Sequence, residues 1–504
     1  MPWIKDIFLF NPEKPLIFTQ LYFWIFYAVI LAVYSIIYRD RALRNGFLFL
    51  ASLFFYWKTS GFFFLILVFS TFANYYIGNW IYRAEKKSSK NAGVVLSIVL
   101  NLLLLSYFKY TYLFVDTINK VFHTHIEVVN YLAKWSNSLT GTHFDISQIL
   151  LPVGISFYTF QIMSYTLDLY RKKVYPVKNI MDFGFYVSFF PQLVAGPIVR
   201  ASEFIPQIYK RYHLSKEEFG YAIYIIMAGL FKKMFIGDYL AVNFIDRVFA
   251  NPGGFSGFEN LMALYGYSLQ VYVDFSGYTD IAIGVALLLG FHLPRNFNSP
   301  YKATSVGNFW KRWHISLSSW LKDYLYIPLG GNRKGKVRTE INLMITMLLG
   351  GLWHGASWQF LIWGGINGIG LVIYKLWRNI SPYEHSNHWA VRMWKIFITF
   401  QFITFTRIWF RSDSMEHANQ LIHQVTKAFN WSIVPDVLWS YKWVFAVMAL
   451  GYITHWLPEK WKLTVINNYI KTPLWAKILI AVVVIFVIYQ SWSADLQPFI
   501  YFQF

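Results

Sequence analysis

The sequence contains no cysteine and few charged residues. Without cysteine, disulfide bonds, thiolate nucleophiles and cysteine-ligated zinc sites are excluded. Charged residues occupy 14% of the 504 positions, whereas an ordinary soluble domain has about 25%. The chain has no separate polar domain on which basic residues could cluster, so its formal net charge of +20 does not indicate a nucleic-acid partner.

Apolar and aromatic side chains are abundant instead. Hydrophobic residues account for 56% of the chain and aromatic residues for 21%, including 22 Trp and 36 Tyr. This composition is typical of proteins whose aromatic rings sit at membrane interfaces. The lysines and arginines fall in short connectors between apolar runs, as expected for cytoplasmic loops. They can also attract an anionic cytosolic partner, such as a nucleotide-phosphate donor or an acidic carrier protein.

The apolar runs predict an all-α, polytopic integral membrane protein with roughly 10 to 13 membrane-embedded helices. We expect one membrane domain over 1–504, with N-terminal spans and an extracytoplasmic segment in 1–145, a catalytic core in 146–376 and C-terminal spans in 377–504. The first run is too long for the apolar part of a signal peptide, so we expect it to remain in the mature protein. The runs lie near 16–38, 60–82, 92–115, 148–169, 219–245, 340–353, 357–376, 393–410, 440–456 and 475–492.

The distribution of basic residues predicts the orientation of the first part of the chain. Loops near 39–44, 83–90 and 171–173 are rich in Lys and Arg and are expected inside, whereas the polar segment 119–146 is expected outside. Beyond residue 180 the alternation blurs. Non-helical backbone at membrane depth is tolerated only where protein buries it or it lines a cavity, so we expect the active site in this middle third. The interruptions there are Pro191, Gly196, Pro197, Asp274, Gly277, Asp280, Pro294, Pro300 and Pro328.

His354 is the first candidate for chemistry, because it lies between two apolar runs in the segment LLGGLWHGASW. An ionisable side chain at membrane depth is costly and by default marks a site. A neutral imidazole can take a proton from an attacking hydroxyl at neutral pH, and desolvation favours the neutral form. The flanking glycines permit close approach by a narrow substrate. The pattern alone is equally compatible with a histidine at a helix end that bonds a carbonyl.

His314 is the second candidate and lies in the segment FWKRWHISLSSW. Trp310, Trp313, Leu317 and Trp320 share one face of a predicted amphipathic helix, with the charged residues largely elsewhere. Such a helix lies at the interface or is wedged into the cytosolic mouth of a cavity. The alternative is a surface helix with an incidental histidine.

Two further segments carry charge beside apolar runs. Asp274 and Asp280 are six residues apart, which is not a same-face helical spacing, so they favour buried hydrogen-bonding or capping groups at a helix break. The segment GGNRKGKVR at 330–338 can hold phosphates through backbone N–H groups and cations, but a cytoplasmic anchor explains its charges equally well.

Taken together, several segments resemble the membrane-bound O-acyltransferase family, in particular its alginate O-acetyltransferase branch, which is related to the D-alanyl transfer protein of teichoic acids. The resemblance runs in order from about residue 150 to the end. The matching segments are 151–161, 189–198, 274–278, 296–301, 309–317, 326–333, 351–355 and the tail 498–504.

The resemblance implies that His354 is the active-site histidine and that His314 matches the second histidine of the same core. It also implies a ring of helices around a thin centre, with funnels from both faces meeting at the catalytic histidine. The implied reaction moves an acetyl group from cytosolic acetyl-CoA to a hydroxyl acceptor, with His354 as general base. No bound cofactor or metal is expected.

For the donor, the resemblance implies an inner mouth near 310–333. The candidate residues for binding the donor or stabilising the oxyanion are Trp310, Trp313, Asn332, Arg333, Trp353 and Asp274. The implied location is the bacterial cytoplasmic (inner) membrane, where the chain contacts lipid. A separate extracytoplasmic acyltransferase is the expected partner that passes the acetyl group to a polysaccharide.

Two alternatives remain open. Within the family, the donor can be an acyl or D-alanyl group on a carrier protein, because the basic segments suit an acidic carrier as well as CoA phosphates. From another class, broken helices in a polytopic chain also suit a transporter or flippase. Transporters commonly show interruptions at matching positions of two repeats, whereas here they crowd into 190–360.

Overall fold

The computed structural model describes residues 9–11, 15–140, 144–194 and 196–491. These residues form helices and loops without a β-strand, which confirms the all-α prediction. The tail segment 498–504 lies outside the described residues. By its internal contacts the chain divides into two compact units, one of residues 1–194, 198–211 and 355–357 and the other of 195–197, 212–354 and 358–504. The prediction of a single domain with three segments stays a prediction.

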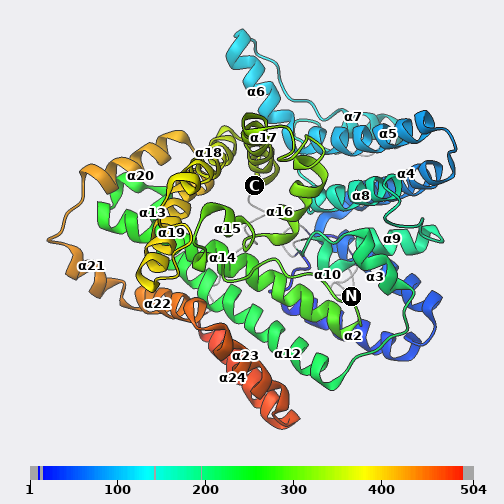
Figure 1. Ribbon diagram of the computed structural model, residues 1–504. Coiled ribbons are helices and arrows are strands. Elements are labelled where there is room, and N and C mark those ends of the chain that lie inside the picture. Colours follow the sequence, from blue (N-terminus) through cyan, green and yellow to red (C-terminus); the bar gives the residue numbers. More distant parts are fainter. Residues whose placement is uncertain (1–8, 12–14, 141–143, 195, 492–504) are drawn as a thin grey trace. The chain divides into compact units, whose positions relative to one another are not determined.

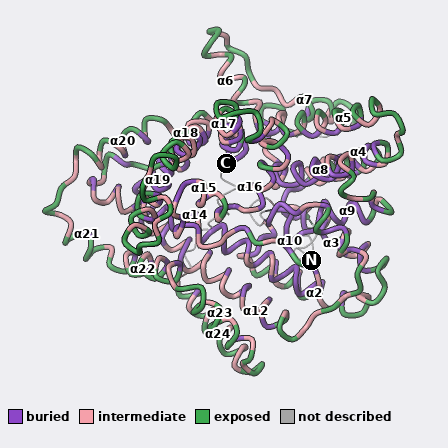
Figure 2. The backbone as a smooth tube through the Cα atoms, viewed as in Figure 1, coloured by how far each residue is buried: buried purple, intermediate pink, exposed green. Residues whose placement is uncertain are grey.

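In the first unit, α8 is almost completely buried and packs against α4 and α5 (Figures 1 and 2). Polar side chains join these three helices. Ser97 donates to Asn74 at 2.7 Å and lies 3.0 Å from Thr166, and Asn101 donates to Asn74 at 2.9 Å. Such hydrogen bonds hold apolar helices together where hydrophobicity gives little preference. The elements are α2 (Leu21–Ile37), α3 (Arg41–Ser60), η1 (Gly61–Phe63), α4 (Phe64–Arg83), α5 (Lys87–Leu105), η2 (Ser106–Tyr110), α6 (Thr111–Phe122), α7 (Tyr131–Thr140), α8 (Ile155–Tyr170), α9 (Ile180–Ser188), α10 (Phe190–Leu193) and α11 (Ala201–Ile208).

The second unit is built around the long helix α14, which is buried along most of its length, while α24 is exposed (Figure 2). The elements are α12 (Lys216–Leu230), η3 (Phe231–Asp238), η4 (Ala241–Ile245), α13 (Asp246–Ala250), η5 (Pro252–Gly254), α14 (Gly257–Leu288), η6 (Pro300–Lys302), α15 (Val306–Trp310), α16 (Ile315–Leu321), η7 (Lys322–Tyr326), α17 (Lys336–His354), α18 (Trp358–Ile380), α19 (Trp389–Arg411), α20 (Met415–Lys427), α21 (Val434–Ser440), α22 (Lys442–Trp456), α23 (Glu459–Lys471) and α24 (Leu474–Ser491).

The expected helix break at Asp274–Asp280 is wrong, because α14 continues through both residues. Helix α12 crosses α14 closely at Gly229, where an added Cβ atom would lie 2.6 Å from the carbonyl oxygen of Gly277. The irregular backbone instead follows α12, in the π-helical segments η3 and η4. π-Helical turns within α-helices are frequent near functional sites.

Two ion pairs connect this π-helical stretch to α14. Lys232 pairs with Asp280, and Lys233 contacts Asp274 at 2.6 Å and Asp238 at 2.7 Å. The two aspartates therefore serve as counter-charges inside an unbroken helix rather than as caps at its end. Adjacent lysines reach different partners along α14.

Membrane-crossing helices are present in both units. Six stretches of the described chain are long and apolar enough, or seven if the bent pair α21 and α22 counts as one span. Three of them have 35 residues or more, well above the about 20 needed for one pass. The multi-pass architecture is confirmed, and the number of embedded helices stays a prediction. The six stretches are Arg41–Arg83, Lys87–Phe122, Lys216–Ala250, Gly257–Leu288, Trp358–Ile380 and Leu474–Ser491.

Candidate active site

His354 is the last residue of α17 and is buried, with 3% of its surface exposed. The sequence of α17 before His354 is apolar, and the helix ends before Gly355. Its position is set by α18, which packs along α17 (Figure 1). The imidazole ring stacks edge-on against Trp363 of α18 at 5.1 Å and against Phe410 of α19 at 5.5 Å. Three helices of the second unit therefore hold this ring.

The close approach of α17 and α18 depends on glycine. An added Cβ atom on Gly351 would lie 2.3 Å from the carbonyl oxygen of Phe360 and 3.1 Å from the Cα atom of Gly364. The glycines beside His354 were expected to permit the close approach of a substrate. At Gly351 the neighbour that approaches is the backbone of α18.

Replacing Gly351 with alanine is expected to push the two helices apart and to displace His354. Overpacking of this kind typically costs about 1–3 kcal/mol, so we expect a lower melting temperature together with reduced activity. The control is Gly365→Ala on α18, where the nearest atom to the new Cβ is a flexible Leu348 methyl group at 3.5 Å. Equal melting temperatures for both variants in detergent would contradict this interpretation of the helix crossing.

His314 is completely buried, so the surface-helix alternative is wrong. The segment is also not one amphipathic helix. It divides into α15 and α16, and His314 lies at the junction with φ 43° and ψ 56°. A non-glycine residue in this left-handed region is uncommon and clusters at functional sites. The break turns the imidazole inward, because the helix that would have placed it on a surface ends at Trp310.

The two histidines are neighbours. Their ring centres lie 6.1 Å apart, and Trp353 contacts both rings, at 5.7 Å from His314 and 5.1 Å from His354. Phe275 of α14 packs edge-on against His314 at 4.7 Å. Burial lowers the pKa of His314 to about 3, so this imidazole is neutral at pH 7. A neutral imidazole therefore lies beside His354 in an apolar surrounding.

His354 borders a cavity of about 90 Å³. A volume of this size accommodates several water molecules, since one requires about 10–15 Å³ by a comparable measure, or a short acyl group. Reachability of His354 from both membrane faces stays a prediction. The cavity is lined by Trp310, Leu317, Ser318, Leu321, Thr346, Met347, Gly350, His354, Trp363 and Leu371.

The other predicted site residues fall into three groups. Trp310 lines the cavity, while Trp313 and Trp353 are buried beside the histidines. Asn332 and Arg333 are exposed in the turn before α17 and do not border the cavity.

Asp274 is paired with Lys233 inside the second unit, as described above. The roles of all these residues in catalysis and donor binding stay predictions. Among the described residues, no group of three His, Asp or Glu side chains is arranged to hold a metal ion.

Three residues around the histidines were missed by the sequence analysis: Trp363, Phe410 and Arg407. Trp363 and Phe410 are ordinary apolar-run residues, so no local signal distinguishes them. Arg407 is a cation within the apolar run 393–410, so it carries the same sequence signal as His354, that of an ionisable group at membrane depth.

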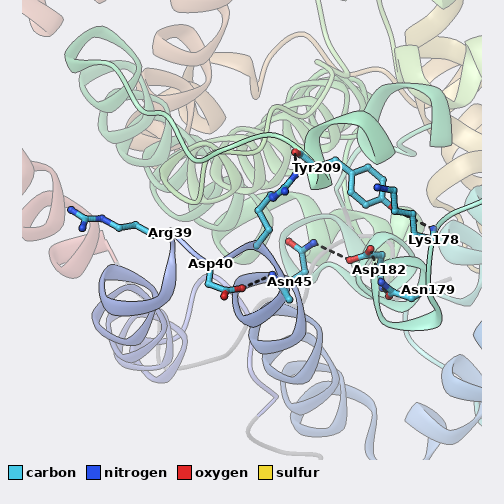
Figure 3. A pocket seen from close by; sticks show the side chains of 9 residues that line it. Arg39, Asp40, Asn45, Lys178, Asn179, Asp182 and Tyr209 are labelled. Atoms are coloured by element: carbon cyan, nitrogen blue, oxygen red, sulfur yellow. Dashed lines mark hydrogen bonds between the residues drawn. The ribbon is translucent and has the colours of Figure 1, made fainter.

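A larger pocket of about 450 Å³ lies in the first unit, beside the loop predicted to be cytoplasmic. Figure 3 shows Asn45 and Asn179 directed at Asp182, which accepts hydrogen bonds of 2.9 and 3.0 Å from their amide groups. Asp40 caps α3 by accepting from two backbone N–H groups. Both carboxylates thus accept hydrogen bonds that hold the local structure.

Comparison with known proteins adds a family match. A model of the membrane-bound O-acyltransferase family matches residues 171–412. This range includes His314, His354 and the helices that hold them.

Several bacterial proteins are similar over most of the chain. A probable alginate O-acetylase, AlgI, of Pseudomonas syringae is 36% identical over 420 residues, covering 82% of this chain and 76% of the relative. A peptidoglycan O-acetyltransferase of Helicobacter pylori is 35% identical, covering 74% and 72%. A teichoic acid D-alanyltransferase of Bacillus subtilis is 30% identical, covering 55% and 72%.

Proposed function

Since this chain belongs to the membrane-bound O-acyltransferase family, we propose that it transfers an acetyl group from cytosolic acetyl-CoA to a hydroxyl acceptor, for O-acetylation of a cell-envelope or exported polysaccharide. The observation that carries the proposal is the position of His354. Its imidazole is buried, borders a small cavity and lies beside a second, neutral imidazole. A general base at a buried site with room for a small acyl group is what this reaction requires.

In the proposed reaction, His354 takes the proton from the acceptor hydroxyl as its oxygen attacks the thioester carbonyl carbon. A tetrahedral oxyanion forms and then collapses, the C–S bond breaks, and the thiolate leaves with the proton that His354 returns. The products are the acetyl ester and free CoA thiol. His314, buried beside His354, is proposed to hold the reacting groups and the protonated imidazole in place.

The cavity beside His354 favours a short acyl group. Its lining is mostly apolar, and a volume of about 90 Å³ accommodates a short acyl chain. Leu321 borders it from α16. Leu321→Ala is therefore expected to raise the rate with propionyl- and butyryl-CoA relative to acetyl-CoA by about 10-fold or more, since a methylene contributes about 1–3 kcal/mol to discrimination.

The control for this variant is Leu421→Ala. Leu421 is another buried leucine of the same unit, and it lies on α20 beside a separate cavity. Both truncations cost about 2–5 kcal/mol of stability, so loss of packing alone cannot explain a difference in acyl preference. An unchanged ratio of butyryl to acetyl rates in Leu321→Ala would place the acyl group elsewhere.

The function itself is tested with the purified chain in lipid nanodiscs and labelled acetyl-CoA. Because the protein has no cysteine, a thiol reagent reports released CoA without background from the enzyme. The expected result is thiol release accompanied by label in an ester of an added acceptor that carries a free hydroxyl group. Movement of substrate without a new ester would instead indicate a transporter.

A carrier-protein donor is the second candidate, because the relatives include a D-alanyltransferase of teichoic acids. The same assay separates the two donors. Thiol release from an acylated carrier, but not from acetyl-CoA, would replace the proposed donor.

A bacterial cytoplasmic membrane is the proposed location, since the relatives named for O-acetylation of alginate and peptidoglycan are bacterial. The donor is cytosolic and the polymer is outside, so an extracytoplasmic acyltransferase is proposed to receive the acetyl group and pass it on. Co-expression with such a protein should increase polymer acetylation. This chain should still release thiol from acetyl-CoA.

A further inference from the structure

Arg407 is buried in the second unit, on the helix that also carries Phe410. It lies on α19, one turn before Arg411, and 1% of its surface is exposed. Its guanidinium carbon lies 4.4 Å from the ring centre of Trp313 and 5.3 Å from that of Phe410. Both rings border the histidines, because Trp313 precedes His314 and Phe410 lies 5.5 Å from His354.

The charge of Arg407 has no counter-charge among the described residues. Its three guanidinium nitrogens are buried without a hydrogen-bond acceptor. The hydroxyl of Tyr301 lies close enough to hydrogen-bond to the guanidinium group, but it supplies no counter-charge, because it is neutral and donates its own proton to the carbonyl oxygen of Ser268. Three other cations of the same unit, Lys232, Lys233 and Arg411, each pair with a carboxylate.

A guanidinium group stays protonated in proteins, so it cannot escape burial by releasing a proton. Contacts with two aromatic faces offset part of the cost, but a buried charge normally requires an anion. Asp413, an acid that follows in the sequence, contacts Arg411 instead. An anion that is present only during binding or reaction would complete the site.

We propose that Arg407 is an anion-binding residue of the acyl-transfer centre, and that an anionic oxygen of the bound reactants provides its missing counter-charge. This inference rests on the proposed function. The oxygen has two possible sources: the tetrahedral oxyanion, which exists only in the transition state, or a permanent phosphate or carboxylate group of the donor or acceptor. Fixed cations directed at developing negative charge are a common means of catalysis.

Arg407→Met tests the proposal, because methionine keeps an unbranched apolar stem against Trp313 while removing the charge. Removing a buried charge that lacks a partner is not expected to destabilise the fold, so the melting temperature should be unchanged or higher. Activity should fall by about 10²–10³-fold, as for loss of one oxyanion donor. Arg407→Lys should recover part of it. Steady-state thiol release from acetyl-CoA in nanodiscs gives kcat and KM.

The two kinetic constants separate the two sources of the anion. A lower kcat with unchanged KM indicates the oxyanion, because that interaction exists only in the transition state. A higher KM for acetyl-CoA or for the acceptor indicates a permanent anion on that reactant. In either case Arg407 binds an anionic oxygen.

Arg411→Met is the matched control on the same helix. Arg411 pairs with Asp246 at 2.9 Å and with Asp413 at 3.4 Å, so its removal should lower the melting temperature while the folded fraction keeps its kcat. The proposal is overturned if Arg407→Met retains kcat and KM within about twofold, or if it loses stability and activity together as a structural residue would. Absence of turnover by the wild-type protein overturns the proposed function as well, whereas wild-type turnover with an unaffected Arg407→Met variant overturns this inference alone.

Discussion

Replacement of His354 by glutamine is expected to reduce acetyl transfer by about 10²–10⁴-fold, the range that a positioned general base contributes. Glutamine approximates the size of imidazole and still forms hydrogen bonds, but it cannot accept the hydroxyl proton. His354→Ala should remove the same activity. Because three aromatic neighbours, Trp353, Trp363 and Phe410, keep their own packing, the amount of protein in the membrane should remain near the wild-type level.

His292, a histidine of the same unit outside the candidate site, provides the control. His292 is largely exposed and lies 3.0 Å from Glu218 at the surface, so His292→Gln should leave thiol release and envelope acetylation unchanged. The measurement is O-acetyl content of the host's envelope polysaccharide together with thiol release by purified protein. Full acetylation by His354→Gln would remove the catalytic assignment.

Replacement of Lys233 by methionine is expected to have the largest effect on stability. Lys233 is buried and lies between two carboxylates, Asp238 at 2.7 Å and Asp274 at 2.6 Å. Its removal leaves two like charges close together with no cation between them. Breaking a buried pair by removing one partner costs about 3–5 kcal/mol. We therefore expect a strongly lowered melting temperature and little folded protein.

The rescue variant combines Lys233→Met with Asp238→Asn and Asp274→Asn, which removes all three charges at once. Neutral replacement of a buried charge set is often tolerated, so this variant should recover most of the melting temperature. It also tests the predicted role of Asp274, because an unchanged KM for acetyl-CoA in the rescued protein would exclude Asp274 from donor binding. Failure of the triple variant to fold would show that hydrogen-bond geometry, rather than charge balance, holds this site.

Much of the secondary structure could be predicted from local sequence. Each of the ten apolar runs is helical over most of its described residues, and the prolines from Pro294 to Pro328 fall in connectors or short turns. Apolarity and the missing N–H group of proline are properties of the residues themselves, so they act in any tertiary context. His354 was identifiable for the same reason, as an ionisable side chain between two apolar runs.

The errors occurred where polar residues inside an apolar run were interpreted without their partners. Asp274 and Asp280 suggested a break, but the lysines of η3 satisfy them and α14 continues. The periodic tryptophans of 310–320 suggested one helix, but the chain turns at His314 to bury its ring. In both cases a contact with another element outweighed the local pattern.

Composition and apolar periodicity were sufficient to establish a multi-pass helical membrane protein and to single out His354. Both conclusions depend only on residues that are neighbours along the chain. The pairing of His314 with His354, the glycine contact between α17 and α18, and the buried charge of Arg407 beside Trp313 emerged only on folding. Each joins residues that are distant in sequence, and the energy of such a contact depends on which side chain lies opposite.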